Sequence, residues 1–193
     1  MKFIIQPYNP SWPEEFQRVK ASLETILNEV DYVSIEHVGS TSIPGMAAKP
    51  VIDIDIIVKP SSLVASRVAL VGAGYLDMGE IHLRGQFQFR QPGYGRLEPA
   101  LGEKDADGRP RRNTYVMIEG CLPLRNHLDV RRVLLEDADL REEYAAFKYS
   151  LADKDHKDVG AFAGAKTEII WKILRTAGWS EEDYAPLRLA NTK

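Results

Sequence analysis

The stretch IEHVGSTSIPGMAAKPVIDIDIIV, residues 35–58, decides the fold, because it sets a loop rich in Gly, Pro, Ser and Thr between two β-rich segments, 32–38 and 51–58. The second segment carries Asp53 and Asp55 between isoleucines. Residues two apart on a strand share one face, so the carboxylates lie about 6.5–7 Å apart along it. Burying two like charges is unfavourable unless a cation or a cleft accompanies them.

Composition limits the classes of function. The chain has 193 residues, 44% hydrophobic and 27% charged, which suits one globular domain with a substantial core. A net charge of −3 argues against general binding of nucleic acid or anionic membranes, although a local basic pocket for a phosphorylated ligand is compatible with it. No segment has the length of a signal peptide core or a membrane span, so we expect a cytoplasmic protein. The single cysteine, Cys121, excludes an internal disulfide and a thiolate zinc cluster.

Hydrophobic periodicity predicts a mixed α/β (α+β) domain with a small early sheet, surrounding helices and a helical C-terminal third. We expect this domain to span 1–178, followed by a partly disordered tail, 179–193. Residues 91–113 are rich in Gly, Pro and charge and predict a long mobile loop. The further predicted elements are strands at 3–5, within 83–91 and at 114–118, and helices at 12–29, 61–73, 122–134, 138–152 and 158–177.

Two features of the central stretch point to phosphate and metal chemistry. Two carboxylates on one strand face can bind one or two hard divalent cations such as Mg²⁺ or Mn²⁺. Gly39 and Ser40 offer a backbone that a phosphate can approach closely, with N–H and hydroxyl donors, and Thr41 extends this set. The aspartates are therefore candidate metal ligands and catalytic residues.

The spacing of Gly39-Ser40 and Asp53-x-Asp55 resembles the nucleotidyltransferase superfamily. More narrowly, YNPSWPEEF near the N-terminus and IEHVGSTSIPGMAAKPVIDIDI resemble the GrpB-like family, UPF0157, over nearly the whole chain. The resemblance implies a polymerase-β-like core, a nucleoside triphosphate whose phosphates lie at Gly39 and Ser40, and two Mg²⁺ ions at the aspartates. It also implies a relation to a domain found fused to dephospho-CoA kinase.

The chain departs from the superfamily pattern at the third carboxylate. The strand expected to carry it reads Asn113-Thr114-Tyr115-Val116, with no acid, and a tyrosine is a poor general base at neutral pH. The sequence therefore leaves open whether the protein catalyses transfer or only binds nucleotide.

Six further side chains are candidates for the same site, each with a structural alternative. Lys49 and Arg90 are placed to neutralise phosphate, or are exposed charges. Lys148 and Lys166 either cover a triphosphate or take part in helix packing. Tyr144 lies on the same helix face as Lys148 and is more readily explained by packing. His37 is either an acid–base group or scaffold.

We assign structural roles to His127, Asp129 and Cys121, because a helix over 122–134 takes Asp129 away from the strand face.

Three functions are compatible with these residues. The first is a Mg²⁺-dependent nucleotidyltransferase that uses a nucleoside triphosphate and a small-molecule acceptor. The second is a non-catalytic nucleotide- or metabolite-binding accessory module of the same fold, which the missing carboxylate favours. The third is an interaction protein whose aspartates are paired by protein groups alone.

Overall fold

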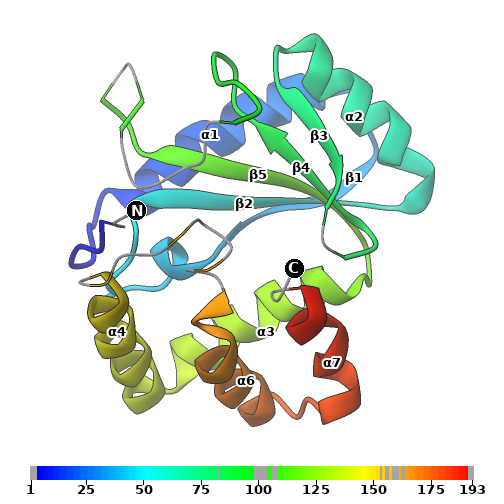
Figure 1. Ribbon diagram of the computed structural model, residues 1–193. Coiled ribbons are helices and arrows are strands. Elements are labelled where there is room, and N and C mark those ends of the chain that lie inside the picture. Colours follow the sequence, from blue (N-terminus) through cyan, green and yellow to red (C-terminus); the bar gives the residue numbers. More distant parts are fainter. Residues whose placement is uncertain are drawn as a thin grey trace.

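The computed structural model describes residues 4–81, 83–97, 104–105, 108–152, 154, 157, 161 and 164–190. Five strands form one mixed sheet with helices on both faces (Figure 1). The longer helices and the strands are α1 (Trp12–Ile26), β1 (Tyr32–Val38), β2 (Val51–Val58), α2 (Leu63–Gly72), β3 (Leu76–Glu80), β4 (Gln86–Arg90), β5 (Arg111–Ile118), α3 (Leu122–Glu136), α4 (Ala138–Ala152), α6 (Thr167–Thr176) and α7 (Glu181–Ala190).

The sheet has the order β1-β2-β5-β4-β3, and only β2 and β5 run parallel. Alternation along β2 divides its side chains between two layers. Ile52, Ile54 and Ile56 pack with α1 and α2 in the main core. The opposite face carries Asp53, Asp55 and Ile57, and Ile57 packs with Leu124 of α3. The expected α+β class is confirmed.

The strands β1 and β2 begin and end where the sequence predicts, because Gly39 follows the first and Pro50 precedes the second. Other predictions are wrong. Ile4 and Ile5 belong to no strand, and Gln6 forms only an isolated bridge with Ala48. The first helix ends at Ile26 rather than residue 29.

The prediction of a loop over 91–113 is wrong for its last three residues, because β5 already begins at Arg111. Its residues 98–103, 106 and 107 lie outside the described part of the chain. The helix predicted from 158 is described as α6 only from Thr167 onward, while 158–160, 162 and 163 are also not described.

The C-terminal segment packs against the helical layer. Trp179 and Tyr184 are buried with Trp171 of α6, and the Tyr184 ring stacks on Trp171 at 4.8 Å. The expectation of disorder is therefore wrong for α7, although the division of the chain at residue 178 stays a prediction. The left-handed φ of Gly178, +84°, allows its N–H to close the last turn of α6 on the Arg175 carbonyl. Within the described residues, no helix combines the length and apolar character that a membrane span requires.

Candidate functional site

The parallel pairing of β2 and β5 brings Asp53 beside Asn113. The two residues are register partners, and the Asn113 amide nitrogen donates a hydrogen bond of 2.8 Å to Asp53 Oδ1. Asn113 therefore occupies the position where a third carboxylate was sought. An amide there stabilises the ionised form of Asp53, whereas a second carboxylate would repel it.

The turn after β1 approaches the other oxygen of the same carboxylate. Gly39 has φ +69° and ψ −174°, a region essentially restricted to glycine. A Cβ at this position would lie 2.3 Å from Asp53 Oδ2, well inside van der Waals contact. Gly39 thus allows the backbone leading into Ser40 to pack directly against Asp53.

Thr41 and His37 hold this turn in place. The Thr41 hydroxyl donates its one proton to the Val51 carbonyl at 3.1 Å, so its oxygen accepts from His37 Nε2 at 3.0 Å. The His37 ring stacks on Phe16 at 4.7 Å. Burial, assisted by the nearby Arg131 guanidinium, lowers the pKa of His37 to about 4. The imidazole is therefore neutral at pH 7, and it stabilises the turn through its hydrogen bond to Thr41.

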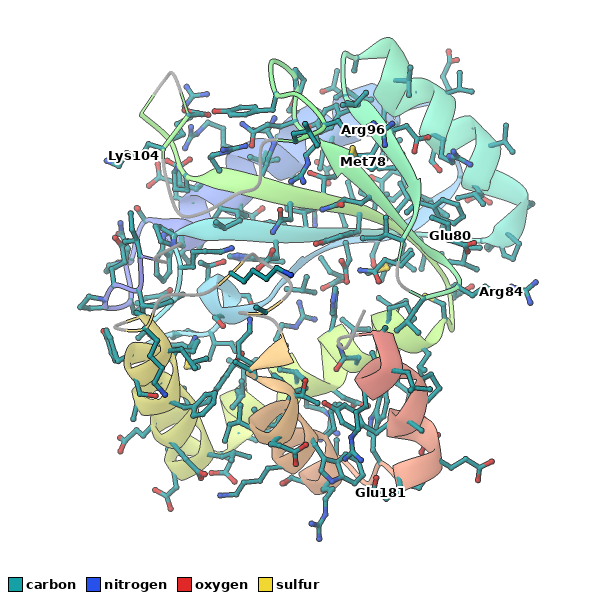
Figure 2. The ribbon with its side chains drawn as sticks, viewed as in Figure 1. Met78, Glu80, Arg84, Arg96, Lys104 and Glu181 are labelled. Atoms are coloured by element: carbon teal, nitrogen blue, oxygen red, sulfur yellow. The ribbon has the colours of Figure 1, made fainter. Side chains whose placement is uncertain are left out.

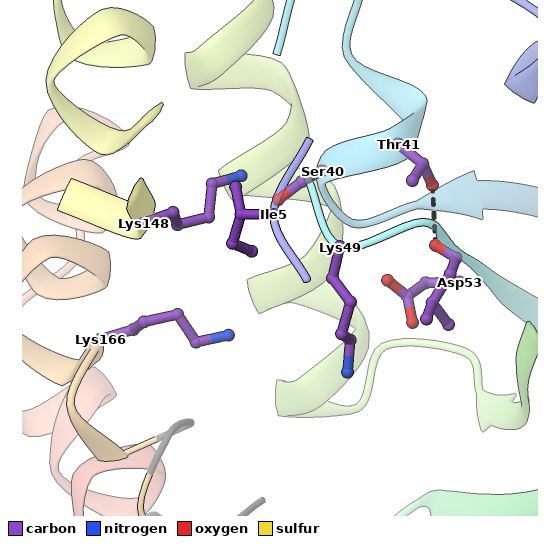
Figure 3. Close-up of a pocket in the computed structure, with 8 residues that line it drawn as sticks. Ile5, Ser40, Thr41, Lys49, Asp53, Lys148 and Lys166 are labelled. Carbon is purple, nitrogen blue, oxygen red and sulfur yellow. Dashed lines mark hydrogen bonds between the residues drawn. The ribbon is translucent and has the colours of Figure 1, made fainter. Parts of the chain in front are cut away.

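A pocket with about 380 Å³ of open space lies beside Asp53, and we call it the lysine pocket. Figure 3 shows the amines of Lys49, Lys148 and Lys166 around it, coming from the segment before β2, from α4 and from the residue before α6. The pocket is lined by Ile5, Ser40, Thr41, Lys49, Val51, Asp53, Lys148 and Lys166. Six of the predicted phosphate-site and metal-site residues thus meet here.

Burial perturbs the charged groups of the lysine pocket. Desolvation lowers the pKa of Lys166 to about 8, with repulsion from Lys49 acting in the same direction and Asp53 opposing it. The pKa of Lys148 is held well below its usual range, first by desolvation and then by Lys166. Desolvation raises the pKa of Asp53, against the Asn113 hydrogen bond and Lys49. An anion among the amines would favour their protonated forms.

Tyr144 and Lys148 join α4 to the loop that carries the pocket. Lys148 Nζ donates to the Ala47 carbonyl and lies 4.6 Å from the centre of the Tyr144 ring. The Tyr144 hydroxyl is hydrogen-bonded to Ser40, and burial raises its pKa. Tyr144 therefore positions Ser40 and does not itself line the pocket.

Asp55 has a separate environment and does not line the lysine pocket. Its side chain is fully buried, and Oδ2 is 2.8 Å from His127 Nδ1 on α3. Burial lowers the pKa of His127, but the charge and hydrogen bond of Asp55 outweigh this and raise it overall. Asp55 Oδ1 is buried without a hydrogen-bond partner among the described residues.

From the sequence, His127 was assigned a structural role, but its pairing with Asp55 was not predicted. A usable signal was present, since His127 follows the buried Leu124 by three positions and therefore shares its sheet-facing side of α3.

The remaining candidates lie outside the pocket. Tyr115 is the register partner of Asp55, with its ring 6.0 Å from His127, and burial raises its pKa, so it is no base at neutral pH. Arg90 ends β4 on the same sheet face as Tyr115. Asp129 accepts a 2.8 Å bond from the Trp179 indole, and Cys121 packs near Gly85.

The oxygen donors of the site suit Mg²⁺ only if substrate phosphates and water supply most of its ligands. Within the part of the chain that the structure describes, no three His, Cys, Asp or Glu side chains gather to hold a metal by themselves. Mg²⁺ needs fewer protein ligands, because it is usually bound by one or two carboxylates together with substrate phosphates and water. Asp53, at the edge of the lysine pocket, suits that arrangement, and the unpartnered Oδ1 of Asp55 is the second available oxygen.

Comparisons with known proteins agree on one family. Residues 2–176 match the profile described as GrpB protein. A UPF0157 protein of Halalkalibacterium halodurans is 30% identical over 171 residues, covering 88% of this chain and 80% of the relative. A dephospho-CoA kinase of Mycolicibacterium paratuberculosis is 32% identical, with 90% of this chain matching 47% of the kinase.

Among solved structures, the conserved protein GrpB from Enterococcus faecalis has a TM-score of 0.72 at 27% identity, covering 90% of this chain and 96% of that one. The Cid1 poly(U) polymerase bound to MgATP has a TM-score of 0.44 at 11% identity over 75% of this chain and 45% of that one.

Proposed function

This chain belongs to the GrpB family, and we propose that it binds a nucleoside triphosphate with Mg²⁺ or Mn²⁺ and transfers the nucleotidyl group to a small-molecule acceptor. The observation that carries this proposal is the lysine pocket, in which three amines and the Ser40 hydroxyl surround one side of Asp53. Lysine ammonium groups and hydroxyls are common phosphate ligands, and a carboxylate beside them suits the accompanying cation.

Each part of the pocket has a role in this proposal. Lys49, Lys148 and Lys166 bind the phosphate oxygens, and Ser40 with the neighbouring backbone orients them. Asp53 would hold the cation, which would neutralise charge that develops on the phosphates. In transfer, the acceptor hydroxyl oxygen bonds to the α-phosphorus, its proton passes to water, and the bond from the α-phosphorus to the bridging oxygen breaks, so that the electron pair leaves with pyrophosphate. The lysines then stabilise the departing pyrophosphate.

A second function, nucleotide binding without catalysis, is favoured by a specific observation. Asp55 is fully buried and already paired with His127, and Asn113 and Tyr115 occupy β5 beside the two aspartates. No carboxylate within the strand β5 is therefore available to activate an acceptor. The related dephospho-CoA kinase, in which a similar segment forms about half the chain, is compatible with an accessory role.

Thermal unfolding with nucleoside triphosphates, with and without Mg²⁺ or Mn²⁺, tests the binding step. A ligand at about 100 times its Kd stabilises by roughly 2.7 kcal/mol, which corresponds to a midpoint shift of about 5–11 °C in a domain of this size. We expect Asp53→Asn to lose the metal-dependent part and Lys166→Gln to weaken binding. Asp31→Asn, a change at a surface carboxylate that is 77% exposed, is the matched control. Unchanged metal and nucleotide affinity in Asp53→Asn would contradict the proposal.

Release of pyrophosphate separates the two functions. Metal-dependent release that requires an added acceptor and is abolished by Asp53→Asn would establish transfer. Tight nucleotide binding without release would support the accessory module.

A further inference from the structure

A second hollow lies on the opposite face of the sheet from the lysine pocket. It encloses about 510 Å³ of open space between α1 and the first residues of β2 and β5, and we call it the arginine hollow. The sheet separates the two sites, since Ile52 and Arg112 line the hollow beside α1, whereas their neighbours Asp53 and Asn113 lie on the opposite face, where Asp53 lines the lysine pocket. The arginine hollow is lined by Glu15, Arg18, Val19, Ser22, Ile52, Arg109, Pro110 and Arg112.

The arginine hollow is positively charged although the chain as a whole carries −3. Three guanidinium groups, Arg18, Arg109 and Arg112, face a single carboxylate, Glu15, which pairs with Arg18 one turn along α1. Among the described residues, neither Arg109 nor Arg112 forms an ion pair with an acidic side chain. Within the described lining, guanidinium groups therefore outnumber carboxylates by two.

Arg112 is held in place but incompletely satisfied. One terminal nitrogen donates to the Tyr75 hydroxyl at 3.3 Å, and the guanidinium lies 5.7 Å from the centre of the Tyr75 ring. Its Nε is buried and has no hydrogen-bond partner among the described residues. A buried donor without a partner is costly, so an acceptor in the hollow would relieve that cost.

We propose that the arginine hollow is a second ligand site, which binds a small phosphorylated molecule. Guanidinium groups match phosphate oxygens in bidentate geometry. Ser22 supplies a hydroxyl, and Val19, Ile52 and Pro110 supply an apolar wall for the non-phosphate part of the ligand. Because the sheet lies between, this ligand is distinct from a nucleotide in the lysine pocket.

Inorganic pyrophosphate, titrated into ¹⁵N-labelled full-length protein without divalent metal, is the probe for this site. We expect amide shifts at Arg18, Ser22 and Arg112, and a shift of the Arg112 Nε–H signal. Plotted against pyrophosphate concentration, these shifts should give a binding curve different from that of residues in the lysine pocket.

Paired variants separate the two sites. Arg18→Gln with Arg109→Gln should weaken binding at the hollow at least tenfold and leave the lysine-pocket shifts unchanged, and Lys49→Gln with Lys166→Gln should do the reverse. Arg84→Gln with Arg96→Gln removes the same charge from residues that do not line the hollow, and Arg84 extends outward between β3 and β4 (Figure 2).

Three results would overturn the proposal. One is the absence of shifts at the hollow at millimolar pyrophosphate, and another is an equal loss in the Arg84/Arg96 control. The third is equal affinity for succinate, which would exclude a phosphate preference. Thermal midpoints of all variants within a few degrees of the parent confirm that each comparison is made on folded protein.

Discussion

Replacing Gly39 by alanine tests the contact on which the candidate site depends. The new Cβ would lie 2.3 Å from Asp53 Oδ2, and the backbone has φ +69° with ψ −174°. Holding a residue with a side chain in that region costs about 1–3 kcal/mol. Displacing Asp53 also breaks its 2.8 Å bond from Asn113, which is worth roughly 1.5–3 kcal/mol for a charged acceptor. Together they predict a loss on the order of 4 kcal/mol.

Urea and thermal unfolding measure this loss, which corresponds to a midpoint decrease of roughly 8–16 °C. Gly45→Ala is the matched control, because Gly45 has φ +77° and a Cβ added there would meet no atom within 4 Å beyond its chain neighbours. We expect it to cost only about 1–2 kcal/mol. In an Asp53→Ala background, which removes Oδ2 but keeps the Cβ that would lie 3.1 Å from the new methyl, Gly39→Ala should lose most of its excess cost over Gly45→Ala. Equal costs of Gly39→Ala and Gly45→Ala in the parent protein would refute the contact.

Three further predictions concern titration and packing. Because His37 has a pKa of about 4 when folded and about 6.5 when unfolded, stability should fall by up to roughly 3 kcal/mol as pH drops from 6.5 to 4, and His37→Gln should flatten this slope in urea titrations. Because the pKa of Lys166 is about 8, the affinity of the lysine pocket for pyrophosphate should fall above pH 8, which calorimetry measures. Lys166→Gln should reduce this pH dependence. Tyr184→Ala should cost about 3–5 kcal/mol in urea unfolding, whereas Leu189→Ala, at a residue 66% exposed, should stay within about 0.5 kcal/mol.

Each of these predictions has a distinct contrary result. An unchanged acid slope in His37→Gln would show that other groups control stability in that range. A pH dependence of pyrophosphate affinity that persists in Lys166→Gln would place the titrating group elsewhere. A cost for Tyr184→Ala as small as that of Leu189→Ala would mean that α7 adds nothing to the folded core.

The parts of the fold that were predictable from sequence are those with one dominant signal. The apolar run of β2 and the helical spacing of apolar residues in α1 each favour one structure, and both elements form. By contrast, β3 reads LDMGE, in which Gly79 and two acids leave no alternation. The helix α7 was missed because Pro186 lies inside it and acids dominate its first turn, while its stability comes from Tyr184 packing on Trp171.

For the candidate site, the sequence predicts which side chains share a face of one strand. It does not predict which side chains from distant segments meet in space. Asp53 and Asp55 could be placed on one face from alternation alone. That Lys49, Lys148 and Lys166 line one pocket depends on how α4 and α6 pack on the loop, and no local pattern encodes this. The same reason explains why Asn113 and His127 were not recognised as the partners of the two aspartates.

The two aspartates of the Asp-x-Asp motif are stabilised by different groups, which explains how one strand tolerates both. Asp53 receives a hydrogen bond from Asn113 and faces the lysine amines, and Asp55 is paired with His127, whose pKa it raises. A divalent ion that bound both carboxylates would compete with the His127 imidazole for Asp55. In the proposed function, the ion would therefore be held by Asp53 and substrate phosphates, while Asp55 links β2 to α3 through His127.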